Sequence, residues 1–291
     1  MTGSGPLFLG IDGGGSVCRA RISDPDGRVL GEATGGPANI ATDLSGAAAS
    51  IVDAAAEALR SAGLSPDSLG RLRAGLGLAG GNVPTSAAAL LAAPLPFSSV
   101  AVASDAEIAC LGAHGGEDGA ILIVGTGSQG VAMLGGETRT VGGWGFQVSD
   151  TGSGAVLGRA AARRALLAHE GVEASSPFTE ALMARCGGAP ATLLAFAIKA
   201  APRDWATLAP MVFEHAEAGD PVAGTLLGEA VHDVVRLIDR LAGFGASRIA
   251  LMGGLARPYR PHLPARLDLS LVEPRGDALD GALALAARLP G

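Results

Sequence analysis

The sequence predicts an α/β fold of two lobes, and three observations support this prediction. Apolar, strand-like segments alternate with helix-sized segments in the first part of the chain, which is typical of a sheet with parallel strands. A strand followed by a glycine- and hydroxyl-rich turn occurs twice, roughly a hundred residues apart, which suggests a duplicated architecture. The 291 residues, 48% of them hydrophobic, suffice for two cores.

The first lobe begins with a predicted three-stranded meander. Leu7 to Ile11 is a short apolar segment that ends at Asp12-Gly13-Gly14-Gly15-Ser16. Val17 to Ile22 and Val29 to Ala33 have the pattern of extended strands on either side of a turn. We therefore expect three antiparallel strands in succession.

A helix and two further strands complete the first lobe. From Asp43 to Ala62 apolar residues recur every three or four positions, which predicts one buried helical face. Arg71 to Leu78 and Ser98 to Ser104 are strand-like, and a helix-sized segment separates them. This separation indicates parallel pairing on a covered sheet.

The pattern restarts in the second lobe. Ala120 to Val124 is an apolar strand that leads through a glycine turn into extended segments at Val131 to Leu134 and Thr138 to Val141. Beyond Gly152 the sequence is largely helical to Gly243. A strand at Arg248 to Met252 and a helix from about Asp277 to Arg288 follow.

These elements place the domain boundary near residue 115. We expect an N-terminal lobe at 1–115 and a C-terminal lobe at 116–291. The prediction leaves open that the last helix, at about 277–288, packs back onto the N-terminal lobe.

Composition excludes several classes of function. The net charge is −7 and no block of like charge occurs, so nucleic acid is not an expected partner. Cys18, Cys110 and Cys186 form no CxxC pair, which favours a reduced, cytoplasmic location. No apolar run approaches the roughly 20 residues needed to cross a bilayer, so no membrane partner is expected.

Single residue types exclude two kinds of site. Lys199 is the only lysine and follows Ile198, whereas a Walker A loop needs a lysine directly after a glycine. The five histidines are scattered without HxH or HExxH spacing, so a zinc site is not predicted.

The first glycine-rich turn suits phosphate and magnesium. Gly13, Gly14 and Gly15 lack side chains, so backbone N–H groups can approach phosphate oxygens, and the Ser16 hydroxyl adds a donor. Asp12 can hold Mg²⁺ directly or through water, because magnesium prefers hard oxygen ligands. An ordinary glycine-rich hairpin is the alternative.

The second turn, Gly125-Thr126-Gly127-Ser128-Gln129-Gly130, matches the GxGxxG pattern of dinucleotide sites. A dinucleotide loop must open a helix, and the residues after this turn are too few for one before Gly135-Gly136. A β-hairpin that presents Thr126, Gly127 and Ser128 to phosphates is the better interpretation.

Asp105 is the candidate catalytic residue. It directly follows a strand, and ligands commonly bind beyond the carboxyl ends of parallel strands. A carboxylate there can act as a general base in phosphoryl transfer. The alternative is a structural N-cap of the helix predicted at Ala106 to Ala113.

Further glycine-rich loops lie in the second lobe. Asp150 precedes a helix, so it can cap that helix or bind sugar hydroxyls. Trp144, flanked by glycines, is more typical of a packing anchor than of a sugar-site residue. Gly253 and Gly254 end a late strand, where an adenine or ribose could lie against the backbone.

The order of these motifs resembles the actin-like ATPase superfamily of sugar kinases, actin and Hsp70 chaperones. Within it the chain is similar to the BadF/BadG/BcrA/BcrD ATPase family, which includes N-acetylglucosamine and glucosamine kinases. Four segments carry the resemblance: Asp12 to Ser16, Gly125 to Ser128, Met252 to Leu255 and Asp277 to Ala282.

The resemblance implies two ribonuclease H-like lobes, each a mixed five-stranded sheet with flanking helices, and an active-site cleft between them. It implies ATP and Mg²⁺ as cofactors and Asp105 as the catalytic aspartate. Asn39, Gly143 and Asp150 correspond to sugar contacts. Ala79 departs from the pattern, because animal N-acetylglucosamine kinases have a serine there.

The expected function is therefore ATP-dependent phosphorylation of an amino sugar, N-acetylglucosamine or glucosamine, at its 6-hydroxyl. One alternative is an activator ATPase that drives electron transfer in a benzoyl-CoA reductase or 2-hydroxyacyl-CoA dehydratase type system. The others are a non-catalytic sugar sensor and a NAD-dependent oxidoreductase. The sequence leaves open whether the protein forms a homodimer.

Overall fold

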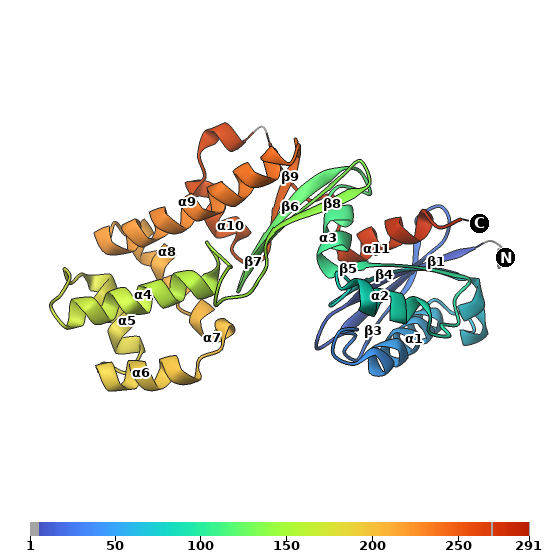
Figure 1. Ribbon diagram of the computed structural model, residues 1–291, viewed down its shortest axis with the longest axis horizontal. Coiled ribbons are helices and arrows are strands. Elements are labelled where there is room, and N and C mark those ends of the chain that lie inside the picture. The colour runs from blue at the N-terminus through green and yellow to red at the C-terminus, as the bar shows by residue number, and fades with distance from the viewer. Residues whose placement is uncertain (1–5, 269, 291) are drawn as a thin grey trace. The chain divides into compact units, whose positions relative to one another are not determined.

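The computed structural model describes residues 6–268 and 270–290. In this part of the chain two compact units form, each built on a five-stranded sheet (Figure 1). The first unit comprises the chain up to Gly119, the segment Met133–Thr138, and the chain from Glu273 onward. The second comprises Ala120–Ala132 and Arg139–Val272. The chain thus leaves the first unit and returns to it at its end.

The first sheet has the strand order β3-β2-β1-β4-β5. β1 pairs antiparallel with β2, and β2 with β3, so the predicted meander is confirmed. β1, β4 and β5 pair in parallel, as the helix-sized segment between the latter two predicted. The strands are β1 (Leu7–Gly13), β2 (Cys18–Ser23), β3 (Val29–Gly35), β4 (Leu72–Leu78) and β5 (Ser99–Ser104).

Helices cover both faces of this sheet. Helix α1 packs its buried Ile51 and Leu59 into a core shared with strand residues such as Leu9, and its N-cap Asp43 accepts a hydrogen bond from the Gly46 N–H. Alternate strand residues face the opposite side, where a Cβ atom on Gly10 would lie 2.8 Å from a carbonyl oxygen of α11. The helical segments of this unit are α1 (Leu44–Ser61), η1 (Pro66–Arg71), α2 (Pro84–Leu91), α3 (Asp105–Ala113) and α11 (Ala278–Ala287).

The second sheet has the strand order β10-β9-β6-β7-β8. β6, β9 and β10 pair in parallel. The two-residue β10 was not predicted, because two residues carry no detectable periodicity. The strands are β6 (Gly119–Val124), β7 (Ser128–Leu134), β8 (Glu137–Gly142), β9 (Ile249–Met252) and β10 (Leu271–Val272).

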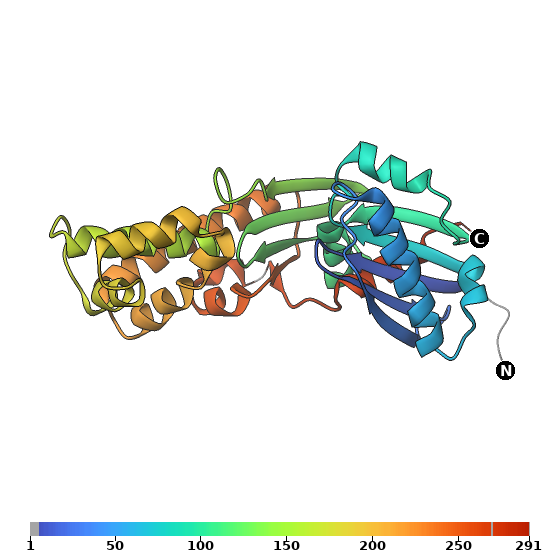
Figure 2. The same ribbon diagram turned by 90° about the horizontal axis from the view of Figure 1, so that it is seen from below.

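The long helical stretch of the second unit forms a group of packed helices. Figures 1 and 2 show α4, α5, α8 and α9 side by side, in agreement with the contacts between them. The segments are α4 (Gly154–His169), α5 (Pro177–Arg185), α6 (Pro190–Lys199), α7 (Pro202–Ala206), α8 (Ala209–Glu217), α9 (Pro221–Gly243), α10 (Ala256–Tyr259), η2 (Arg260–His262) and η3 (Ala265–Leu267).

Within residues 6–268 and 270–290 no single helix is long and apolar enough to cross a membrane. Helices α5 and α6 meet the length and composition criteria only as a pair, and that pair is bent by 64°.

Candidate active site

The carboxyl ends of three parallel strands meet at one edge of the first sheet. Gly13 at the end of β1 is in register with Leu78 at the end of β4, and Leu78 is in register with Ser104 at the end of β5. The Ala79 N–H donates to the Gly13 carbonyl oxygen at 2.8 Å. Asp12 and Asp105, which the sequence predicts for metal binding and catalysis, therefore belong to the same edge.

Asn39 belongs to this edge as well. The N–H of the preceding residue, Ala38, donates to the Gly14 carbonyl (2.9 Å). The N–H of the following residue, Ile40, donates to the Ala79 carbonyl (3.1 Å). The Asn39 side-chain oxygen accepts from the Ala41 N–H at 3.0 Å, which fixes the direction of the amide. The amide NH₂ group makes no hydrogen bond within the described residues, so it can donate to a sugar hydroxyl.

Asp105 is the first residue of α3, and its side chain is exposed. The N-cap interpretation is wrong, because Ser104 is the N-cap and its hydroxyl accepts from the Glu107 N–H. Among residues 6–268 and 270–290, the Asp105 carboxylate accepts only from the N–H of the next residue, Ala106, at 2.8 Å. Its remaining lone pairs can accept a proton or a hydrogen bond from a substrate.

Asp12 has a partner in the adjacent strand. Its Oδ2 accepts two bonds from Arg19, at 2.5 Å from Nη2 and 3.2 Å from Nε. The other oxygen, Oδ1, accepts no hydrogen bond within the described residues. Because Mg²⁺ in nucleotide sites takes few protein carboxylates and several waters and phosphates, one free carboxylate oxygen fits that ion.

The first phosphate loop is anchored at one end and open at the other. The Gly14 N–H donates to the Val17 carbonyl at 2.8 Å, which closes the turn. Gly15 and Ser16 are exposed, and their N–H groups make no hydrogen bond in the described part of the chain. These are the donors that a phosphate oxygen can use.

Cys18, just beyond this loop, is fully buried. Burial, and then the negative charge of Asp12, raise the pKa of its thiol to about 12. The thiol therefore stays protonated at neutral pH and is a poor metal ligand.

In the second unit the carboxyl ends of the parallel strands β6 and β9 carry the two remaining glycine motifs. The Leu255 N–H donates to the Val124 carbonyl (3.0 Å), and the Gly154 N–H donates to the Gly125 carbonyl (2.8 Å). Gly253 has a φ of +92°, and a Cβ atom there would lie 2.4 Å from the Val124 oxygen, so glycine is required. The glycine turn, the loop after β9 and the start of α4 thus form one cluster.

The two hydroxyls of the second turn differ in their surroundings. Thr126 is exposed, and its hydroxyl has no partner among the described residues. Ser128 is buried and donates from its hydroxyl to the Thr151 carbonyl at 2.8 Å. Strand β7 begins at Ser128, so the prediction that this motif leads into a strand instead of a helix is confirmed.

The loop after β8 holds Gly143, Trp144 and Asp150. Trp144 is 77% exposed, so the packing-anchor interpretation is wrong. Gly143 has a φ of +77° and donates from its N–H to the Ser128 carbonyl at 2.9 Å.

Asp150 is buried and has a φ of +62°. Its carboxylate lies against Gly127, where a Cβ atom would come within 2.9 Å of Oδ2, and accepts no hydrogen bond from the described residues. Ser153, not Asp150, caps α4. A non-glycine residue in a left-handed conformation, whose carboxylate oxygens keep solvent contact and have no partner among the described residues, is typical of a ligand site.

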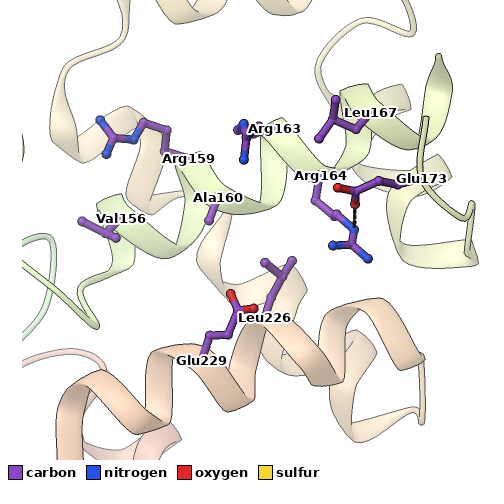
Figure 3. A pocket seen from close by; sticks show the side chains of 9 residues that line it. All are labelled: Val156, Arg159, Ala160, Arg163, Arg164, Leu167, Glu173, Leu226 and Glu229. Atoms are coloured by element: carbon purple, nitrogen blue, oxygen red, sulfur yellow. Dashed lines mark ion pairs between the residues drawn. The ribbon is translucent and has the colours of Figure 1, made fainter. Parts of the chain in front are cut away.

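A separate groove of about 390 Å³ lies between α4 and α9 (Figure 3). Arg164 pairs there with Glu173, and Leu226 and Glu229 of α9 point toward α4. None of the site residues predicted from the sequence lines this groove, so it is distinct from the candidate active site.

Comparisons with known proteins identify the family. Residues 9–262 match the model of the BadF/BadG/BcrA/BcrD ATPase family. This chain belongs to that family. Glucosamine kinase GspK of Vibrio cholerae is 40% identical to it over 97% of this chain and 96% of the relative.

Two further relatives are kinases by name. A structure from Chromobacterium violaceum, provisionally assigned as an N-acetylglucosamine kinase, superposes on this family member with a TM-score of 0.82 at 34% identity, covering 98% of this chain and 100% of that one. An N-acetylmuramic acid/N-acetylglucosamine kinase of Clostridium acetobutylicum is 33% identical over 54% of this chain and 53% of its own. The predicted fold class and family are confirmed.

Sequence reasoning missed two residues at the edge that carries Asp105. Glu107 and Thr138 are hydrogen-bonded to each other at 2.8 Å. The Ser104-x-x-Glu107 spacing is a capping-box signature and could have identified Glu107. Nothing in the sequence signals Thr138, because it is 31 residues away from Glu107.

Proposed function

We propose that this protein transfers the γ-phosphoryl group of ATP to the 6-hydroxyl of an amino sugar. The observation that carries this proposal is Asp105, an exposed carboxylate at the carboxyl edge of the first sheet, released from helix capping by Ser104. The similarity to a glucosamine kinase over nearly the whole chain supports the substrate class.

In the proposed reaction the Asp105 carboxylate accepts the proton of the sugar hydroxyl. The hydroxyl oxygen forms a bond to the γ-phosphorus, and the bond between that phosphorus and the β,γ-bridging oxygen breaks, so that ADP leaves. Asn39 from the first unit orients the sugar through its free amide NH₂.

Each unit offers donors that suit phosphate oxygens. In the first unit these are the free N–H groups of Gly15 and Ser16 within the loop Gly13 to Ser16, and in the second unit the exposed Thr126 hydroxyl. Asp12 would hold Mg²⁺ through its free Oδ1, and the ion would supply neutralisation of phosphate charge when bound. Gly253 permits the close approach of the loop to Val124, and Gly254, where an added Cβ atom would have nothing within 4 Å, leaves room beside the backbone for the nucleoside.

Glucosamine is the first sugar to test. Ala79, whose N–H is bonded to Gly13, presents a methyl group at the position where animal N-acetylglucosamine kinases have a serine. The 40% identical relative is a glucosamine kinase by name, in line with this difference.

The activator ATPase alternative receives less support. Thiolate ligands would be needed for an iron–sulfur cluster. Cys18 and Cys110 are both fully buried, and Cys186 lies in the other unit. Burial also raises the pKa of Cys186, so no thiol is disposed to ligate.

The test is an ADP-release assay with glucosamine, N-acetylglucosamine, glucose and N-acetylmannosamine, repeated with Asp105→Asn. We expect turnover of an amino sugar in the wild type and a loss of about 10²- to 10⁴-fold in kcat in the variant, with ATP binding retained. Asp53→Asn, an exposed aspartate of α1, is the matched control and should keep the wild-type rate. A near-normal rate for Asp105→Asn would remove it from the mechanism.

A further inference from the structure

The carboxylate of Glu107 is engaged on both oxygens. Oε2 accepts from the backbone N–H of Ser104 at 2.8 Å and from its hydroxyl at 2.9 Å. Oε1 accepts from the hydroxyl of Thr138 at 2.8 Å. All three residues belong to the first unit.

The two residues of this capping box flank Asp105 in the sequence. Ser104 precedes it, Glu107 follows two positions later, and the two side chains close a reciprocal capping box around it. Among the described residues the Asp105 carboxylate accepts a hydrogen bond from the N–H of Ala106 and from no other element. The direction of the carboxylate therefore depends on how firmly the first turn of α3 is held.

Thr138 adds a contact that a capping box does not need. Capping satisfies the free N–H groups of a helix within the helix itself, and Ser104 and Glu107 already do this. Thr138 comes instead from β8, 31 residues beyond Glu107. An exposed hydroxyl–carboxylate bond contributes little to stability, so its main effect is to restrict the orientation of Glu107.

We propose that Glu107 is a positioning residue for Asp105, and that Thr138 acts through it. The Thr138 hydroxyl holds the Glu107 carboxylate, which holds Ser104 and thereby the backbone from which the Asp105 side chain projects. This inference rests on the proposed function in one respect, the role of Asp105 as base.

Thr138→Val tests the inference with a minimal change, because it removes the hydroxyl and keeps the branched shape. We expect kcat to fall by about 3- to 10-fold while the KM for ATP and the melting temperature stay unchanged, since misplacement of a catalytic group lowers the rate of the chemical step. Thr138→Ser, which keeps the hydroxyl, should restore the rate.

Thr140→Val is the matched control. Thr140 lies two residues further along β8, on the same face of the strand, is exposed, and makes no side-chain hydrogen bond within the described residues. It should retain wild-type kcat. An equal loss in both valine variants would overturn the proposal, since it would reflect strand packing.

A double-mutant cycle separates the two residues. Glu107→Ala should lower kcat by about 10- to 100-fold, and Glu107→Ala combined with Thr138→Val should be no slower than Glu107→Ala alone. Additive losses would show that Thr138 does not act through Glu107. If Glu107→Ala fails to fold, the comparison of the Thr138 variants with Thr140→Val still decides whether the Thr138 hydroxyl contributes to kcat.

Failure of this inference differs from failure of the proposed function. If Asp105→Asn is inactive and Thr138→Val matches wild type, the positioning role is wrong and the base is retained. If Asp105→Asn is active, the base assignment is wrong, and positioning of that base falls with it.

Discussion

At the scale of single residues, each unit carries one candidate sugar-contacting carboxylate, and the two have opposite surroundings. Asp105 is exposed and little engaged, whereas Asp150 is buried, has a left-handed backbone conformation and accepts no hydrogen bond from the described residues. The carboxylate oxygens of Asp150 keep solvent contact and have no donor among the described residues, so they are available to accept hydrogen bonds from a bound molecule. Asp150 is therefore the sharpest test of the proposed sugar site.

We predict that Asp150→Asn raises the KM for the sugar by about 10-fold or more, because hydrogen bonds to a charged acceptor contribute about 1.5–3 kcal/mol. The melting temperature should stay the same or rise. Asparagine tolerates the left-handed conformation, and its neutral amide costs less to bury. Steady-state kinetics and thermal denaturation measure both effects, with Asp26→Asn in an exposed turn as control. An unchanged sugar KM would exclude a sugar contact.

At the scale of elements, the sequence predicted most strands, and the helices α1, α3 and α11, within one or two residues, whereas it indicated the helices between Gly152 and Gly243 only as one largely helical stretch. The Asp43-capped helix and the parallel strands β4 and β5 follow directly from apolar spacing. What it could not predict are the contacts that join distant segments. The Ser128 hydroxyl donates to the Thr151 carbonyl, 23 residues away. Asn39 is held at the strand edge by its two neighbours, because the Ala38 N–H donates to the Gly14 carbonyl and the Ile40 N–H donates to the Ala79 carbonyl. Such contacts depend on tertiary packing that leaves no local pattern.

Asp220 shows how one side chain joins two helices. It caps α9 through the N–H groups of Val222 and Ala223, and it accepts from the Phe178 N–H and the Ser176 hydroxyl at the start of α5. Burial opposes its charge, but these hydrogen bonds outweigh burial and hold the pKa of Asp220 below its usual value. The stabilisation is thus present above the usual aspartate pKa and is lost as the pH falls through the lowered value.

We predict that Asp220→Ala lowers the free energy of unfolding by about 2–3 kcal/mol at pH 7, through loss of the cap and of acceptors for buried donors. The deficit relative to wild type should begin to shrink below about pH 4, where Asp220 of the unfolded chain becomes protonated, and should shrink further as the pH falls through the lowered pKa of the folded protein. Urea denaturation at several pH values measures this. Asp204→Ala, the capping residue of the short helix α7, provides a comparison with a smaller expected loss. A deficit that does not vary with pH would contradict the charge-based explanation.

At the scale of the whole molecule, the first unit is made from both ends of the chain. Helix α11 packs on β1, β4 and α3, and Arg21 of β2 binds Asp277 (3.0 Å) and Asp280 (2.6 Å) at the start of that helix. The approach of α11 to α3 is so close that a Cβ atom on Gly281 would lie 1.8 Å from the Ile108 carbonyl oxygen.

We predict that Gly281→Ala destabilises the protein by about 2–4 kcal/mol, because the added methyl group forces two backbones apart. Gly228→Ala on α9 is the control, since nothing lies within 4 Å of its added Cβ atom. Alanine there should stabilise by about 0.5–1 kcal/mol through helix propensity. Chemical denaturation of the three proteins compares them, and equal effects of the two substitutions would refute the close-packing argument.

The return of α11 has a consequence for biosynthesis. Strands β1 to β5 emerge from the ribosome first, yet the helix that covers one of their faces is translated after the whole second unit. The second unit, by contrast, has its full sequence once Val272 has been made. Since domains fold as units while the nascent chain lengthens, we expect the second unit to mature before the first, with an apolar face of the early strands uncovered until α11 has been made.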